Sequence, residues 1–234
     1  MPSSQKVRLR IAGRVAELCR RFPESLARFD ATDLFTGPSL YFHRKTIARR
    51  KAHVNVAELL EDAEFCDSLY ATLTAWGMHR MGPGNTKLLD LDLIKASFRS
   101  QAASIQALDG RILGAGPESE TSQIARAVWR IVESLRVSVA EARIVANSKA
   151  LHHILPSLVP PIDREYSFRF FYGRNTLSIE EGLAFEEMFV ELDRIARSCE
   201  SEIRERIGRG WHTSHSKVVD NAIVGYMIGK NGTA

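Results

Sequence analysis

A lysine and an aspartate stand on either side of a proline turn in one short segment of the sequence. Lys149 opens the apolar run that ends at Pro156, and Asp163 follows the pair Pro160-Pro161. A lysine amine can attack an electrophilic carbon when burial lowers its pKa, or it can hold a phosphate by charge alone. A carboxylate can stabilise a developing cation or activate water. This segment is therefore the first candidate for chemistry.

Asp163 has two roles open to it. The prolines before it restrict the backbone to extended or turn conformations, and residues 164–171 have the pattern of a helix. Asp163 is therefore expected at a helix N-cap, where its side chain accepts a backbone N–H bond. As a catalytic group it would instead lie beside the oxocarbenium ion of a sugar that is losing its base.

Lys149 follows Asn147 and Ser148, which places it in the first turn of a helix expected to run to Leu155. In this position it either grips a phosphate or forms a Schiff base with the sugar of an abasic site. The adjacent His152 and His153 cannot share one helix face, so they are not expected to hold a metal together. One of them should face the core or pocket and the other the solvent.

Two further segments combine large side chains with cations. A helix that ends in the glycine-rich stretch 76–85 would present Trp76, Met78 and His79 to stacked bases and Arg80 to phosphates, unless Met78 packs in the core. Aromatic and basic residues interleave over 35–51, where bases could stack and phosphates bind. The candidates there are Tyr41, Phe42, His43, Arg44 and Lys45, with core packing as the alternative for the aromatic ones.

Positive charge gathers in the N-terminal part of the chain. Residues 1–53 contain twelve Lys and Arg against four Asp and Glu, a balance of +8, while the whole chain carries +4. The remainder is therefore net negative by four. A concentrated basic face is expected of a protein that binds phosphates, although a solvated helix face would give the same count.

Helical periodicity runs through almost the whole sequence and predicts an all-α fold. Apolar residues recur at helical spacing in Val7–Arg21, Val56–Trp76, Leu88–Leu108, Ser122–Leu135, Val139–Leu155, Ile179–Cys199 and Val218–Ile228. We expect one compact helical domain over residues 1–234, with two lobes and a cleft between about residues 70–85 and 143–170.

Composition excludes several classes of protein. No apolar run reaches the roughly 18 residues of a membrane span, and the N-terminus lacks the apolar core of a secretion signal. Cys19, Cys66 and Cys199 form no metal-binding or disulfide pattern. We expect a cytoplasmic monomer without a cofactor or a metal.

Taken in order, these segments resemble the helix-hairpin-helix DNA glycosylase superfamily, which includes the endonuclease III-like enzymes. The stretch Leu69–Leu93 is similar to the helix that ends in a base-wedging loop, Ala142–Lys149 stands where the hairpin would lie, and Val159–Phe170 stands where the catalytic aspartate begins a helix. The resemblance implies a two-lobed helical bundle, with Asp163 as the catalytic aspartate and Lys149 as the lyase lysine.

The resemblance implies an enzyme that binds double-stranded DNA, flips a damaged or modified base and hydrolyses its N-glycosidic bond. Asn147, Ser148, His152 and Arg164 would join the DNA-binding set. The pattern SKxLHxLxP…PxD also resembles uncharacterised bacterial proteins, some from defence loci, which implies modified phage DNA as a substrate.

Two alternatives remain. The hairpin segment lacks glycine, which favours a non-catalytic nucleic-acid-binding protein on the same scaffold. In the other, a structural or toxin-related helical protein uses its basic face to bind an acidic partner.

Overall fold

The computed structural model describes residues 4–32, 35, 37–78 and 87–231 of the chain. Every regular element in these residues is a helix or a helical turn, and the only β pairing described is two isolated bridges. The prediction of an all-α fold is confirmed. The elements are α1 (Gln5–Arg20), α2 (Phe22–Asp30), α3 (Pro38–Lys51), α4 (Val56–Glu61), α5 (Ala63–Leu73), η1 (Thr74–Met78), α6 (Leu91–Ser100), α7 (Ala102–Gln106), η2 (Glu118–Glu120), α8 (Thr121–Ser134), α9 (Ile144–His152), η3 (Arg164–Phe168), α10 (Arg169–Tyr172), α11 (Glu181–Ser198), α12 (Glu200–Arg206) and α13 (His215–Asn231).

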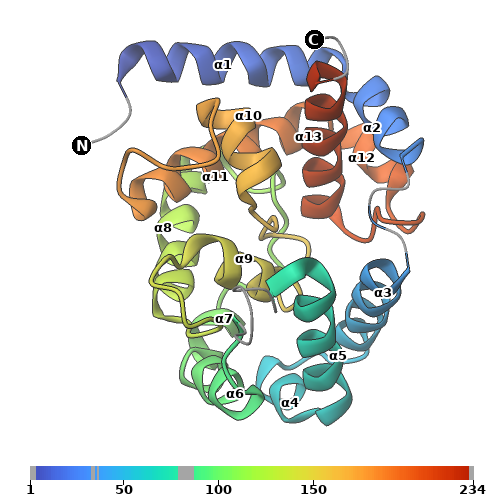
Figure 1. Ribbon diagram of the computed structural model, residues 1–234, viewed down its shortest axis with the longest axis vertical. Coiled ribbons are helices and arrows are strands. Elements are labelled where there is room, and N and C mark those ends of the chain that lie inside the picture. Colours follow the sequence, from blue (N-terminus) through green and yellow to red (C-terminus); the bar gives the residue numbers. More distant parts are fainter. Residues whose placement is uncertain (1–3, 33–34, 36, 79–86, 232–234) are drawn as a thin grey trace.

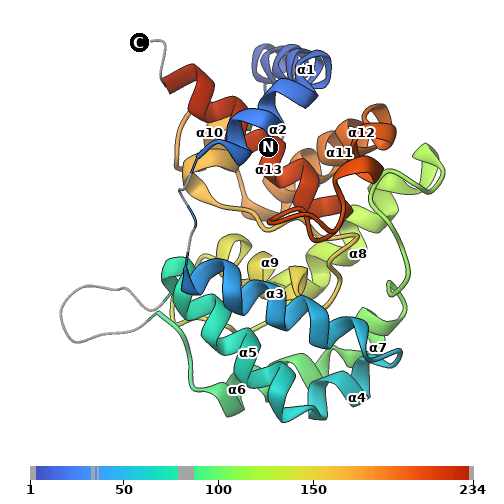
Figure 2. The ribbon, with the colours of Figure 1, turned by 90° about the vertical axis from the view of Figure 1, so that its right-hand side faces the viewer.

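The helices gather in two groups along the longest axis of the molecule (Figure 1). Helices α1, α2 and α10–α13 lie at one end, α3–α7 lie at the other, and α8 and α9 lie between them. The chain leaves the first group after α2 and returns to it after α9, so both termini belong to the same end. The turned view in Figure 2 shows the same separation.

Close contact between α2 and α13 holds the two ends of the chain together. A Cβ atom added at Gly225 would lie 1.9 Å from the carbonyl oxygen of Ser25, so only glycine allows this approach. Phenylalanines and leucines from both groups of helices form one continuous buried core, which includes Phe22, Phe65 and Phe171. The core is the main stabilising element, because burying each such side chain contributes roughly 1.5–3 kcal/mol.

The helix that carries Lys149 begins later than the apolar pattern predicts. The extended segment before it pairs with another, because the N–H of Leu89 donates to Val137 O and the N–H of Val139 donates to Lys87 O. Helix α9 therefore starts only at Ile144. Two predictions were wrong: Lys149 lies in the second turn instead of the first, and most of the segment assigned to the hairpin is helix.

None of the helices in the described residues is both long enough and apolar enough to cross a membrane.

Candidate functional site

Lys149 and Asp163 line one cavity of about 330 Å³, which we name the Lys149 pocket. Its walls come from α9, α13, the start of α3, the turn η1 and the segments before η3 and α13. Elements of both helix groups therefore contribute to it. The lining residues are Phe35, Ser39, Ala75, Trp76, Gly77, Lys149, Pro161, Asp163, Trp211, Lys217, Asp220 and Val224. The expectation that Lys149 and Asp163 share one cleft is confirmed.

A hydrogen bond between the neighbours of Lys149 and Asp163 in the chain holds the two residues at the same pocket. The N–H of Ile162 donates to the hydroxyl of Ser148 over 3.1 Å, and both groups are buried. Each partner directly precedes a pocket residue, so this bond ties the Pro-Pro turn to α9 at the level of Lys149. Ser148 is fully buried and therefore does not contact DNA, which corrects its assignment as a DNA-binding residue.

The carboxylate of Asp163 caps η3 and also faces the pocket. Its Oδ1 accepts the N–H groups of Tyr166 at 2.6 Å and Ser167 at 3.3 Å. Among the described residues, no group donates to Oδ2. The cap predicted from sequence is confirmed, and it leaves one carboxylate oxygen for a ligand in the cavity.

Lys149 is partly buried in the pocket wall and forms no ion pair with any described residue. Burial lowers the pKa of its amine, while the carboxylates of Asp163 and Asp220 act in the opposite direction. A lysine with a lowered pKa is more often neutral, and a neutral amine is the nucleophilic form.

A second lysine and a second carboxylate lie deeper in the same pocket, and sequence reasoning missed both. The ammonium of Lys217 lies 2.5 Å from Asp220, and both side chains are buried. Burial raises the pKa of the Asp220 carboxyl against the opposing effect of Lys217. The sequence offered one signal for this pair. A lysine and an aspartate three residues apart among the apolar residues of α13 indicate a buried ion pair, because buried charges require partners.

Two tryptophans form the aromatic wall of the pocket. The ammonium of Lys217 lies over their faces, 5.3 Å from the ring centroid of Trp211 and 5.6 Å from that of Trp76. Behind them the ring of His43 stacks on Trp211, with centroids 5.3 Å apart and planes inclined by 20°. Trp76 was predicted as a site residue, whereas Trp211 was not. Its place beside the turn at Gly208–Gly210 gave no periodic signal.

A chain of neutral histidines supports this wall. The carbonyl of Lys149 accepts a bond from Nδ1 of His153 over 2.8 Å, so Nε2 of that ring must accept from Nδ1 of His43 over 3.0 Å. Nε2 of His43 then accepts the hydroxyl proton of Thr213 over 2.8 Å. Burial lowers the pKa of His43 and His153, which keeps both rings neutral. His43 therefore supports the pocket wall and is not a DNA contact.

His152 and His153 are both fully buried, so the prediction that one faces solvent was wrong. His152 donates from Nδ1 to Val159 O over 2.7 Å and stacks against Trp76 and His43. The ring fixes the turn that follows α9 and lies behind the pocket wall. Its assignment to DNA binding is therefore corrected.

Two other predicted DNA contacts are structural. The amide of Asn147 is buried and donates to Val132 O and Leu135 O, both over 2.7 Å, which anchors α9 to the end of α8. The side chain of Met78 is only 7% exposed and belongs to the hydrophobic core, so it cannot be a wedge between bases. His79 and Arg80 lie outside the described residues.

Helix α3 presents fewer free cations than its sequence suggests. Lys45 pairs with Glu64, Arg49 with Asp62 and Glu64, and the buried Arg50 with Asp109. Arg44 and Lys51 are exposed and form no ion pair with a described residue. Most of the charge in this segment is therefore neutralised within the fold.

The predicted aromatic residues of α3 lie outside the pocket lining. Tyr41 is 64% exposed and contacts Phe42 edge to face, with ring centroids 5.2 Å apart. Phe42 is half-buried. At the pocket itself, Arg164 directly follows Asp163 and is exposed to solvent.

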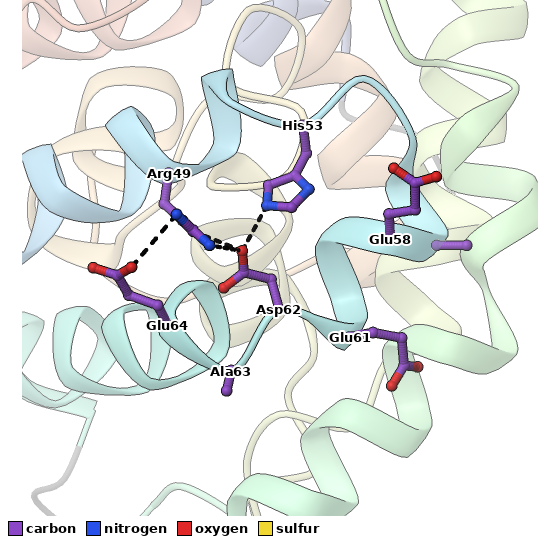
Figure 3. Close-up of a pocket in the computed structure, with 8 residues that line it drawn as sticks. Arg49, His53, Glu58, Glu61, Asp62, Ala63 and Glu64 are labelled. Atoms are coloured by element: carbon purple, nitrogen blue, oxygen red, sulfur yellow. Dashed lines mark hydrogen bonds and ion pairs between the residues drawn. The ribbon is translucent and has the colours of Figure 1, made fainter.

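A second group of charges lies in an open depression between α3, α4 and α5, which we name the Asp62 depression (Figure 3). Oδ2 of Asp62 accepts bonds from Arg49 and His53, both over 2.6 Å, and its Oδ1 caps α5 through the N–H of Phe65. These polar groups satisfy one another and join three segments, which is the pattern of a structural clamp.

Among the described residues, no cluster of three or more His, Cys, Asp or Glu side chains could hold a metal ion. The comparisons with known proteins identify no relative: no family model, no curated protein and no solved structure matches this chain.

Proposed function

We propose that this protein is a DNA glycosylase, which hydrolyses the N-glycosidic bond of a damaged or modified base and leaves an abasic site. One observation carries the proposal: a partly buried lysine lines the same pocket as an aspartate that uses only one carboxylate oxygen as a helix cap, and tryptophans form part of the pocket wall. The proposal also rests on the resemblance of the segments around Lys149 and Asp163 to the helix-hairpin-helix glycosylases.

Asp163 is the proposed catalytic carboxylate. Breaking the bond between the sugar and the base leaves positive charge on the sugar ring, and an ionised carboxylate stabilises that charge or activates the attacking water. The capping bonds fix Oδ1, so the orientation of the carboxylate is set before a substrate binds. Such preorganisation is worth several kcal/mol in the transition state.

The aromatic wall is the proposed apolar surface against which the flipped base packs. Contact with the tryptophans and with Lys217 offsets the few kcal/mol that leaving the duplex costs. A pocket of about 330 Å³ lies within the size range of small-ligand sites. The separation of the helices into two groups, with pocket residues from both, supports a two-lobed scaffold (Figure 1).

Double-stranded DNA is the proposed partner, bound by a monomer in the cytoplasm. The exposed cations Arg164, Arg44 and Lys51 are available for phosphates, since none forms an ion pair with a described residue. Phosphate contacts of this kind position a duplex without reading its sequence. In such a complex the flipped nucleotide would enter the Lys149 pocket.

The decisive experiment is an assay for abasic sites on a panel of damaged and modified DNAs, with phage genomes that carry modified bases. The wild-type protein should form abasic sites on at least one substrate, and Asp163→Asn should not. Salt-dependent DNA binding without abasic sites would instead favour a non-catalytic nucleic-acid-binding protein.

Lys149 is the proposed lyase amine at the same site. A neutral amine beside the newly formed abasic sugar should form a Schiff base, which borohydride reduces to a stable covalent complex. Trapping should disappear in Lys149→Ala while base excision persists. Lys45→Ala, at an exposed lysine outside the pocket, is the matched control.

A further inference from the structure

The buried ion pair of Lys217 and Asp220 lies on α13, on a face that also carries the buried Asn221. Their neighbours Val218, Val219 and Ala222 are buried in the core, and Lys217 and Asp220 are themselves only 7% and 5% exposed. The pair also lines the Lys149 pocket. A cation is therefore held inside the cavity that we assign to the flipped base.

Stability does not explain this pair. Burying two charges costs several kcal/mol for each ion, and well-packed apolar residues often replace such pairs without loss. The ammonium of Lys217 lies over the two tryptophan faces and beside the Asp220 carboxylate, and these contacts fix its direction at the lining of the cavity. A lysine fixed at this place indicates a role toward a ligand.

We propose that Lys217 is the general acid that protonates the departing base, so that the substrate is a base that is uncharged in DNA. The inference rests on the proposed glycosylase function and assigns its leaving-group chemistry. An uncharged base leaves as an anion unless it receives a proton, whereas a base alkylated to a cation leaves as a neutral molecule. Only an uncharged base needs a fixed ammonium.

Proton transfer from Lys217 accompanies cleavage of the bond between the sugar and the base. The bond between C1′ and the base nitrogen breaks, and both electrons stay on the base. Lys217 donates a proton to the base, while water adds to C1′ and gives its proton to Asp163. Lys217 then regains a proton, and Asp163 loses one, by exchange with solvent. General acids of this kind contribute about 100- to 10,000-fold to rates.

Asp220 is the positioning residue for this acid. Its Oδ2 holds the ammonium of Lys217 over 2.5 Å and fixes its direction along the tryptophan wall. The two lysines of the pocket are thereby distinguished. Lys149 forms no ion pair with a described residue and has a pKa lowered by burial, which suits a nucleophile, whereas Lys217 has a carboxylate partner, which suits an acid.

The test compares two duplexes in single-turnover excision, one with an uncharged lesion base such as hypoxanthine or uracil and one with cationic 7-methylguanine. Lys217→Met should slow excision of the uncharged base by about a hundredfold and that of 7-methylguanine by less than about threefold. Lys217→Arg should not restore the rate, because a guanidinium keeps the charge but does not give up a proton. Equal losses on both duplexes, or a wild-type preference for 7-methylguanine, would overturn the proposal.

A binding measurement separates this inference from the proposed function. Two of the three tryptophans line the pocket, so nucleoside binding should quench fluorescence. Deoxyinosine and deoxyuridine should bind more tightly than cationic 7-methylguanosine, and Lys217→Met should reverse that order by about tenfold. An unchanged order overturns the role of Lys217 even where abasic sites form. A reversed order without abasic sites overturns the glycosylase function alone.

Thermal unfolding confirms that each variant folds, and Lys217→Gln is the second variant.

Discussion

The Lys149 pocket and the Asp62 depression both combine cations with carboxylates, but they use them differently. In the depression, Asp62 accepts hydrogen bonds from Arg49 and His53 and caps α5, so the charged groups are paired with one another (Figure 3). In the pocket, Asp163 uses one oxygen as a cap, and Lys149 forms no ion pair with a described residue. Charge density alone therefore does not identify a site. The pocket differs from the depression by its aromatic wall and by charged groups that lack a full set of partners among the described residues.

The two aspartates make the comparison testable, because each is a helix N-cap. The largest effect is expected for Asp163→Asn, which should reduce base excision by about a hundredfold or more in single-turnover assays. Asparagine caps a helix about as well as aspartate, so the unfolding temperature should stay the same. Full activity of this variant on a confirmed substrate would mean that Asp163 is structural.

Asp62→Asn should show the opposite behaviour. The substitution keeps the cap but removes the charge that binds Arg49 and His53, which should lower the free energy of unfolding by about 2 kcal/mol and leave excision unchanged. Chemical denaturation measures the first quantity. A loss of excision with intact stability would show that the depression takes part in function.

The hydrogen bonds of Asp62 also predict that the stability of the protein depends on pH. Burial raises the pKa of Asp62, but the hydrogen bonds from Arg49, the N–H of Phe65 and His53 outweigh it, and the net effect is a lowered pKa. The stabilisation is therefore present above the ordinary aspartate pKa of about 4 and is lost as the pH falls below it. The stability difference between wild type and Asp62→Asn should shrink over that window.

A smaller effect on stability is expected at Lys149, because the burial that suits this lysine to its proposed role destabilises the fold. Burial disfavours the charged form of this amine and therefore costs the fold stability below the ordinary lysine pKa, so Lys149→Met should stabilise the protein by about 1 kcal/mol. The gain should decline as the pH rises through the folded pKa toward the ordinary lysine value of about 10.4. Lys45→Met is the control, and a gain that does not vary with pH would exclude this explanation.

The smallest effect concerns DNA affinity. Arg44→Glu and Lys51→Glu should each weaken duplex binding by about threefold and reduce the salt slope by about one. The matched control is Arg126→Glu, an exposed cation of α8 outside the pocket that forms no ion pair with a described residue. An equal loss in the control would point to net charge alone and would remove α3 from the proposed interface.

The fold class and the helix cap at Asp163 followed from local sequence patterns. Helical periodicity predicted an all-α protein, because an amphipathic helix repeats its apolar face every three to four residues. The proline pair before Asp163 predicted a cap, because proline restricts the backbone on both sides of that position. Both depend on neighbours in the chain, which is why the sequence determined them.

Tertiary structure alone decided which side chains meet. Sequence patterns could not predict that Trp211, Lys217 and Asp220 would join Lys149, since these partners lie 62 to 71 residues away along the chain. Sequence analysis also assigned Asn147, His152 and Met78 to DNA binding, which was wrong. The residue type of a polar or flexible side chain does not indicate whether that side chain faces solvent or the core. Burial is a property of the packed molecule, and it separates the residues that hold this pocket from those that line it.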